Sequence, residues 1–162
     1  MISKIKKLEE KKLIGQSVQM SLSQDKTGQL WGKFAPRIKE IKNKLSLNKI
    51  SMQVYPSSYY EEFSLNNSKN ELFEKWATVE VSDFNDIPHG MESFILEEGL
   101  YAVFYYKGSS SDSSIFDYIF SKWLPNSNYR IDHRPHFEVL GEKYKNNDIN
   151  SEEEIWIPIK KS

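Results

Sequence analysis

One order of elements, strand, helix, strand, strand, is predicted twice along this chain of 162 residues. In the first copy, residues 11–23, 49–60 and 76–83 have the composition of strands and are bounded by turn-forming residues. Apolar residues recur at steps of three and four from Gly28 to Leu45, which predicts a helix. Pro36 lies within that segment and predicts a bend or a late helix start.

The second copy follows a connector, residues 83–99, in which no period is sustained. A helix is predicted over residues 114–124, after a serine-rich stretch suited to helix capping, and Pro125 ends it. The strands of this copy are predicted at residues 99–108, 130–144 and 153–161.

The two copies, about residues 1–83 and 94–162, predict an α+β fold built as a tandem pseudo-two-fold repeat. Neither half alone would bury much, because three strands and one helix leave one face of a sheet uncovered. We therefore expect antiparallel sheets with helices on one side, and both halves within a single domain over residues 1–162. Joints between packed halves are favoured places for pockets, so a ligand cleft is expected between them.

Alternation along the strands predicts which side chains face that cleft. The rows expected to face the helices are Ile155 to Ile159, Phe137 with Val139, and Met52 with Val54. The opposite face then carries a central carboxylate, Glu138, and rings where lysine and threonine are usual in a solvated sheet. These rings are Tyr55, Trp76, Tyr105 and Trp156.

Rings around a carboxylate suit an organic cation or a flat apolar molecule with a positive end, because stacking and cation–π contacts contribute about 0.5 to 2 kcal/mol each. The alternative is that the rings pack against the other half and that Glu138 pairs with a nearby arginine or lysine. Trp31 and Trp123 are further candidates for the cleft wall. Both lie on helix stripes, a position more typical of a core.

Five segments, taken in order, resemble the GyrI-like small-molecule-binding domain, which is also the effector-binding part of bacterial AraC-type and MerR-type multidrug-responsive regulators. The segments are LWGKF (30–34), GLYAVFYYKG (99–108), WLP (123–125), RPHFEVL (134–140) and EEEIWIPIK (152–160). The resemblance runs from about Leu13 to Lys160 and implies two strand–helix–strand–strand units with a cleft between them. It implies that Glu138 lies at the bottom of the cleft and that Trp156 is a wall. It also implies a stand-alone module linked to transcription regulation or drug response, with no DNA-binding segment of its own.

Composition excludes several classes of site. With 22 basic and 23 acidic residues, the net charge of −1 offers no field for a phosphate backbone. The absence of cysteine excludes disulfides and thiolate ligands, and no apolar run reaches the roughly 20 residues that span a membrane. His133 and His136 would point to opposite faces of a strand, so we expect no shared metal and no cofactor. A cytoplasmic location is expected.

Two other functions stay open from the sequence. Glu138 beside a tyrosine in a water-poor pocket would suit a general base, and the resemblance also permits a hydrolase of reactive cyclic electrophiles. The family name further permits a protein partner such as a gyrase, and a homodimer is possible.

Overall fold

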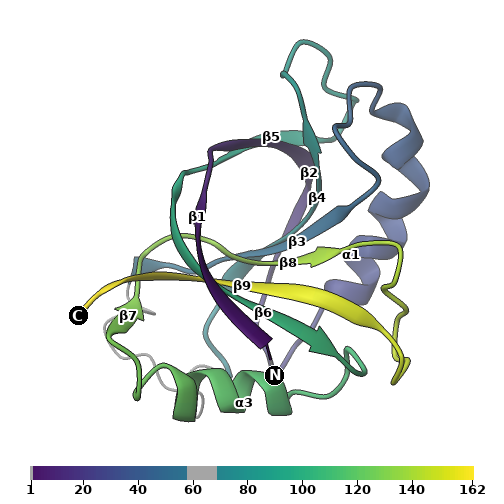
Figure 1. Cartoon of the computed structure of the whole chain (residues 1–162). Coiled ribbons are helices and arrows are strands. Elements are labelled where there is room, and N and C mark those ends of the chain that lie inside the picture. The colour runs from purple at the N-terminus through teal and green to yellow at the C-terminus, as the bar shows by residue number, and fades with distance from the viewer. Residues whose placement is uncertain (1, 58–68) are drawn as a thin grey trace.

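The computed structural model describes residues 2–57 and 69–162, which form an α+β fold (Figure 1). The helical segments are α1 (Thr27–Phe34), η1 (Ala35–Glu40), α3 (Ser114–Tyr118) and η2 (Ile119–Trp123). The strands are β1 (Ile2–Leu8), β2 (Lys11–Met20), β3 (Lys49–Val54), β4 (Phe73–Val81), β5 (Glu92–Leu96), β6 (Gly99–Lys107), β7 (Tyr129–Ile131), β8 (His136–Leu140) and β9 (Glu152–Lys161). No helix of the described residues is long and apolar enough to cross a membrane.

Within the described residues, all nine strands belong to one antiparallel sheet, in the order β1-β6-β9-β8-β3-β4-β2-β5, with β7 paired to β9. The order is symmetric: reversing it gives the same order if β1, β2, β3 and β4 are exchanged with β5, β6, β8 and β9, respectively. The halves meet at the β3–β8 pair. The first strand of each half pairs outside its own half, because β1 pairs with β6 and β5 pairs with β2.

The helices lie on one side of the sheet, over its outer strands. Leu30 and Phe34 of α1 pack with Ala77 and Val79 of β4, and Ile14 of β2 joins them. The second cluster is equivalent and comes from β6, β9, α3 and η2, namely Ala102, Phe104, Tyr106, Ile115, Ile119, Ile155, Ile157 and Ile159. Figure 1 shows α1 and α3 outside the curl of the sheet.

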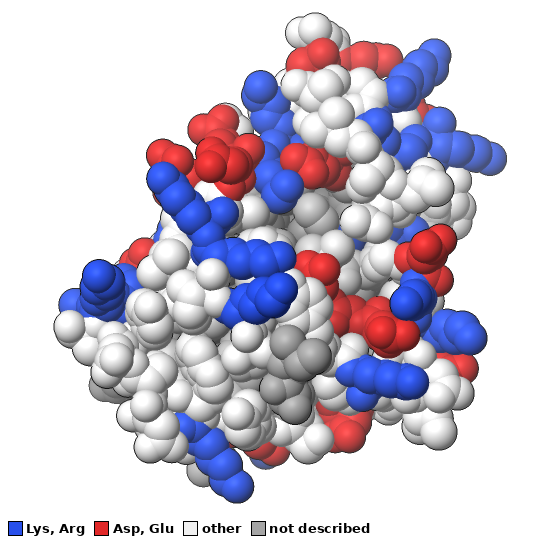
Figure 2. Space-filling model, viewed as in Figure 1, with Lys and Arg blue, Asp and Glu red and all other residues white. Residues whose placement is uncertain are grey.

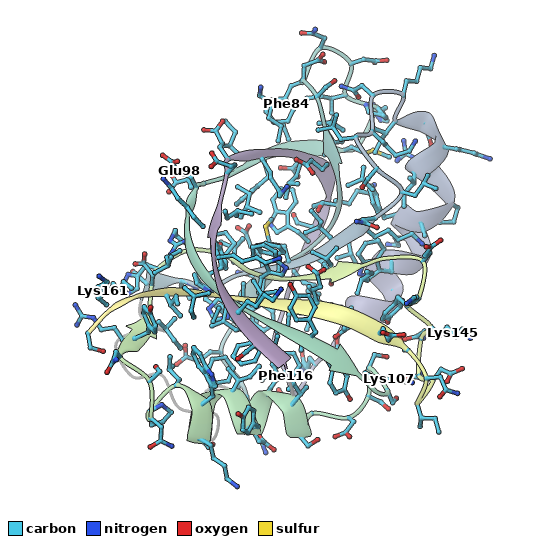
Figure 3. All side chains as sticks on the ribbon, in the orientation of Figure 1. Phe84, Glu98, Lys107, Phe116, Lys145 and Lys161 are labelled. Atoms are coloured by element: carbon cyan, nitrogen blue, oxygen red, sulfur yellow. The ribbon has the colours of Figure 1, made fainter. Side chains whose placement is uncertain are left out.

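The other face of the sheet curls around a third apolar core. Its buried members include Leu8, Leu13, Leu96 and Tyr101, which come from β1, β2, β5 and β6. Only two residues separate β1 from β2 and β5 from β6, so these strands bring the two edges of the sheet towards each other. Figure 3 shows side chains crowding the space that the curl encloses.

The main elements agree with those predicted, and the differences have local causes. Pro36 ends α1 as an α-helix, and a 3₁₀ turn, η1, continues it. The strand predicted at 130–144 is divided into β7 and β8, and the one predicted at 49–60 ends at Val54, with residues 58–60 outside the described part. The sequence analysis missed β1 and β5.

Candidate functional site

Glu138 lies on the helix side of the sheet, at the joint between the two halves. Its cross-strand neighbours are Ser51 on β3 and Ile155 on β9. Directly opposed residues of an antiparallel ladder point to the same face, and Ile155 belongs to a helix-side core. Among the described residues, neither helix-side core takes a member from β3 or β8. The described helices therefore flank these two strands, whose helix-side row is polar apart from Leu140.

The expectation that Glu138 shares a face with Trp76, Tyr105 and Trp156 is wrong. Trp76 is opposite Met52 and Trp156 is opposite Phe137, so both tryptophans lie on the curled face. Tyr105 packs against the same curled core. The prediction of which row of side chains faces the helices failed at β3 and β8 because both faces of the sheet are covered. In these two strands the more apolar row faces the inside of the curl rather than the helices.

The rings of the curled face are packed against one another. Phe137 and Trp156 are stacked with centroids 5.2 Å apart and an interplanar angle of 18°. Trp76 lies 5.2 Å from Phe94. The ammonium of Lys6 on β1 lies 5.6 Å from the Tyr105 centroid and 5.8 Å from that of Trp156. The cation over these rings thus belongs to the chain itself.

Trp31 and Trp123 pack within the two helix-side cores. Trp31 meets Phe34 edge-on with centroids 5.8 Å apart. Trp123 meets Phe104 in the same manner at 5.0 Å. Neither contact brings the tryptophan to Glu138, so the ligand-binding roles of Trp31 and Trp123 stay predictions without geometric support.

Tyr55 is the predicted ring that stands on the same side as Glu138. Its ring lies 4.9 Å from that of His136, the residue two before Glu138 on β8, and 4.9 Å from that of Phe73. His136 is buried, and burial together with repulsion from Arg134 lowers its pKa to about 3. This imidazole is neutral at physiological pH and brings an aromatic surface without a charge.

Glu138 is held by one amide and one ammonium. Gln53 Nε2 donates to Glu138 Oε1 over 3.2 Å, and Lys75 Nζ lies 4.0 Å from the same oxygen. The side chains are 14% and 7% exposed for Glu138 and Lys75. The alternative in which Glu138 pairs with a basic side chain is therefore confirmed. The second oxygen, Oε2, accepts no hydrogen bond from the residues that the structure describes.

A second carboxylate, Glu153 on β9, lies on the same face, two residues from Ile155. Burial raises the pKa of Glu138, against the opposing effects of Lys75 and Gln53. Burial also lowers the pKa of Lys75. The pKa of Glu153 is raised to about 7 by burial and by repulsion from Glu138. The cluster thus contains two acids and one base whose charged forms are all disfavoured by burial.

A cavity of about 480 Å³ adjoins this cluster where β8 diverges from β9. Glu153 and Tyr106 line it from the helix side, and Tyr105, Val139 and Glu154 line it from the curled side. Glu153 therefore lines an open cavity and is close enough to the polar cluster to be influenced by the charges of Glu138 and Lys75. Over the face seen in Figure 2, basic and acidic side chains are interspersed, and neither sign covers it.

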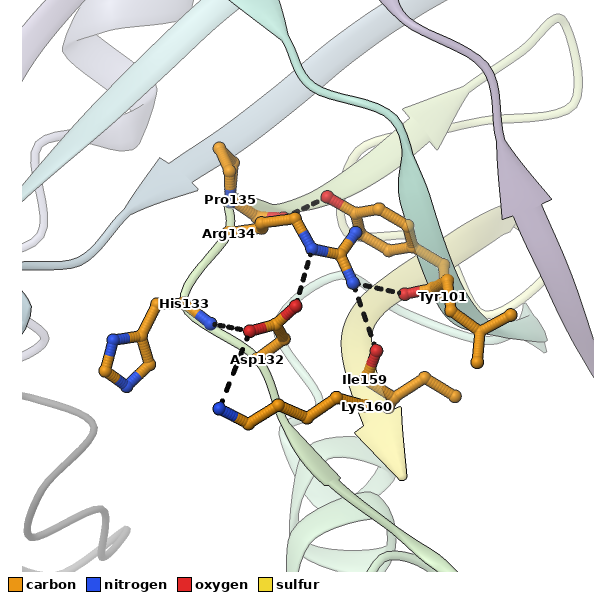
Figure 4. A network of polar contacts seen from close by, with 8 residues as sticks. Tyr101, Asp132, His133, Arg134, Pro135, Ile159 and Lys160 are labelled. Carbon is orange, nitrogen blue, oxygen red and sulfur yellow. Dashed lines mark hydrogen bonds and ion pairs between the residues drawn. The ribbon is translucent and has the colours of Figure 1, made fainter. Parts of the chain in front are cut away.

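The sequence analysis missed a buried guanidinium, that of Arg134, which precedes β8. Its Nε donates to Asp132 over 2.9 Å, and its Nη2 donates to the carbonyls of Leu100 and Ile159 over 2.7 and 3.0 Å (Figure 4). The guanidinium also lies 4.7 Å from the ring centroid of Tyr101. Arg134 thus ties β6 and β9 to the segment that leads into β8. The dipeptide Arg134–Pro135 gave no signal of this role beyond its place in the family motif.

Comparison with known proteins decides the family. The family model of the GyrI-like small molecule binding domain matches residues 1–160. The chain belongs to the GyrI-like family. As a GyrI-like domain it is a small-molecule-binding domain, as the resemblance implied. A comparison with curated proteins gave no match.

Solved structures share the GyrI-like fold at low sequence identity. SAV2435 bound to tetraphenylphosphonium has a TM-score of 0.69 and 15% identity, over 99% of this chain and 94% of that one. The EcmrR C-terminal domain has a TM-score of 0.67 and 14% identity, over 99% and 98%. A hydrolase from Listeria innocua has a TM-score of 0.60 and 13% identity, over 98% and 91%. At such identities the likeness establishes the fold alone.

Proposed function

We propose that this GyrI-like domain binds hydrophobic cations at the β3–β8 joint, with Glu138 as the counter-charge and Tyr55 as part of the aromatic wall. The observation that carries the proposal is an excess of acid in a largely buried cluster, where, among the described residues, Glu138 and Glu153 share one buried ammonium, that of Lys75. A buried carboxylate without a full partner is unfavourable, so a cation that enters the site gains from pairing with it.

Two features support an organic cation over a metal ion. The rings of Tyr55 and His136 lie edge to face on the same side of the sheet as Glu138 and offer apolar contact to a large ligand. No three histidine, aspartate or glutamate side chains of the described residues converge as metal ligands would. The tetraphenylphosphonium bound to SAV2435 is a ligand of the proposed class. The domain would act as a sensor, effector-binding or sequestering module linked to transcription regulation or drug response.

The proposal predicts that Glu138→Gln weakens the binding of tetraphenylphosphonium by at least tenfold, since the amide keeps the shape and removes the charge. The measurement is a titration by calorimetry or tryptophan fluorescence on the whole chain. Glu98→Gln is the matched control, because Glu98 is exposed in the turn between β5 and β6 and the change in net charge is the same. Equal affinity in a folded Glu138→Gln variant would refute the role of the carboxylate.

Two ligands of nearly the same shape and opposite charge distinguish the contribution of charge to the affinity from that of apolar contact. Tetraphenylborate has nearly the shape of tetraphenylphosphonium and the opposite charge. We expect the anion to bind at least a hundredfold more weakly, because it would approach an acidic site. Comparable affinities would mean that the site selects shape rather than charge.

Hydrolysis is the second candidate function, favoured by the raised pKa of buried Glu138 and by the structural likeness to a hydrolase. A carboxylate with a raised pKa is a stronger general base. This function requires product formation from a cyclic electrophile, such as an epoxide, that saturates with substrate and is lost in Glu138→Gln. Absence of turnover across a panel of epoxides and lactones would count against it.

A further inference from the structure

We propose that the site exchanges one proton for each monovalent cation that it binds, and that Glu153 is the group that releases the proton. This inference rests on the proposed binding of cations and adds to it a dependence on pH. It also assigns a function to Glu153, which lies in the last segment of the resemblance, residues 152–160, and to which the resemblance gave no role.

The first step of the argument is the position of Glu153. Ile155 is opposite Glu138, and Glu153 follows on the same face of β9, where its cross-strand neighbour on β6 is Tyr106. Glu153 is half-buried and lines the cavity of about 480 Å³. It is therefore close enough to sense the charge on Glu138 and open enough to exchange a proton with water.

The second step is the charge of the site. With Glu138, Glu153 and Lys75 all ionised, this partly buried cluster would carry a net charge of −1, and one proton on Glu153 would make it neutral. A bound monovalent cation achieves the same neutrality without the proton. In the balanced exchange, the protonated site takes up one cation and releases one proton, which leaves the cation-bound site. Burial favours the neutral state on both sides of this equilibrium.

The neighbouring carboxylates of β9 do not share the face of Glu153. On β9, Glu152 and Glu154 alternate to the other face, and Glu154 accepts a hydrogen bond from Trp156. The remaining charged or titratable groups that face Glu153 or line the same cavity are Lys75, Tyr105, Tyr106, Lys107, Glu138, Glu142 and Lys143. Glu153 has a pKa of about 7, so a small change in the local charge changes its protonation most near neutral pH.

The test is the affinity for tetraphenylphosphonium from pH 5.5 to 8.5, because the charge of this ligand does not titrate. We expect the affinity to rise about tenfold per pH unit below about 7 and to level off above it, as release of one proton requires. Calorimetry in buffers of different ionisation enthalpy should find close to one proton released at pH 6. That measurement uses the unaltered chain and does not depend on the folding of any variant.

The Glu153→Gln variant tests whether Glu153 is the group that releases the proton. The amide resembles the protonated acid, so this variant should keep the weak affinity of the acid limit at every pH and release no proton. Glu98→Gln should retain the full pH dependence. If a folded Glu153→Gln variant still releases a proton, another group, Lys75 or Glu138, is responsible and the assignment is wrong.

Failure of this inference differs from failure of the proposed function. Binding that is strong and independent of pH in the unaltered chain would overturn the proton exchange and leave cation binding intact. Absence of binding at every pH would overturn the proposed function and the exchange with it.

Discussion

Glu138 and Arg134 are buried charges four residues apart, and their partners give them different roles. Arg134 donates to one carboxylate and two backbone carbonyls, which fixes the path of the chain between β7 and β8. Glu138 has both described partners on a single oxygen. A charge whose polar contacts are made by the fold is structural, whereas a carboxylate with an open oxygen can bind a ligand.

The structural role of Arg134 is testable. Arg134→Met removes the donor to Asp132 Oδ2 and to two backbone carbonyls, while Asp132 Oδ1 keeps its hydrogen bond from the His133 N–H and its ion pair with Lys160. We expect this change to lower the free energy of unfolding by about 3–5 kcal/mol. Arg134→Lys should recover only part of this loss, because an ammonium cannot reproduce the fork of the guanidinium. Urea unfolding followed by circular dichroism measures both variants.

Arg37 is the control for Arg134. It pairs with Glu40 over 2.7 Å at the surface, where solvent screens an ion pair, and it donates to the carbonyl of His89 over 2.7 Å. Arg37→Met should therefore change the free energy of unfolding much less than Arg134→Met does. Equal effects of the Arg37 and Arg134 changes would mean that the buried network does not stabilise the fold.

At the level of single residues, the sequence singled out Glu138 as a candidate and predicted little of its surroundings. A carboxylate between Phe137 and Val139 stands out in any strand. Lys75 and Gln53 did not stand out, because they precede Glu138 by more than 60 residues and meet it only through the pairing of β3 with β4 and β8. Such contacts depend on register, which a single sequence leaves open.

At the level of elements, the sequence predicted which segments are strands better than which way they face. Alternation divides a strand into two rows, but it cannot say which row meets the helices when both faces of the sheet are buried. Strands β1 and β5 were missed for another reason. They lie at the edges of the sheet, and lysines such as Lys4, Lys6 and Lys7, which protect an edge from further pairing, hide the strand pattern of β1.

The close approach of β2 and β4 gives a prediction for an element. A Cβ on Gly15 would overlap the carbonyl oxygen of Ala77 and the side chain of Thr78, so the two strands would have to separate. We expect Gly15→Ala to destabilise the chain by about 1–3 kcal/mol. Thermal unfolding monitored by circular dichroism checks this.

At Gly32, unlike Gly15, there is room for a side chain. Gly32 lies within α1 and a Cβ there would meet nothing within 4 Å. Gly32→Ala should stabilise the chain by about 0.5–1 kcal/mol, since alanine favours the helix. Should Gly15→Ala be as stable as Gly32→Ala, the tight β2–β4 contact would not limit the residue at position 15.

For the whole molecule, the continuous sheet predicts one cooperative unfolding transition. The proposed site takes Gln53 and Lys75 from one half and Glu138 and Glu153 from the other, so a ligand there should stabilise both halves together. At a tetraphenylphosphonium concentration 100 times its Kd, the gain should be about 2.7 kcal/mol. Differential scanning calorimetry should find a single peak at a raised Tm. Two separating peaks would show that the ligand stabilises only one half.

Each half supplies the strand that closes the edge of the other, since β1 pairs with β6 and β5 pairs with β2. Cleavage of the chain between β4 and β5 would therefore yield two fragments that each need the other to complete a sheet. Mixing the two fragments should restore the complete sheet, which neither fragment forms alone. A single copy of the unit could satisfy the same pairing only as a strand-swapped dimer, in which two identical chains trade their first strands.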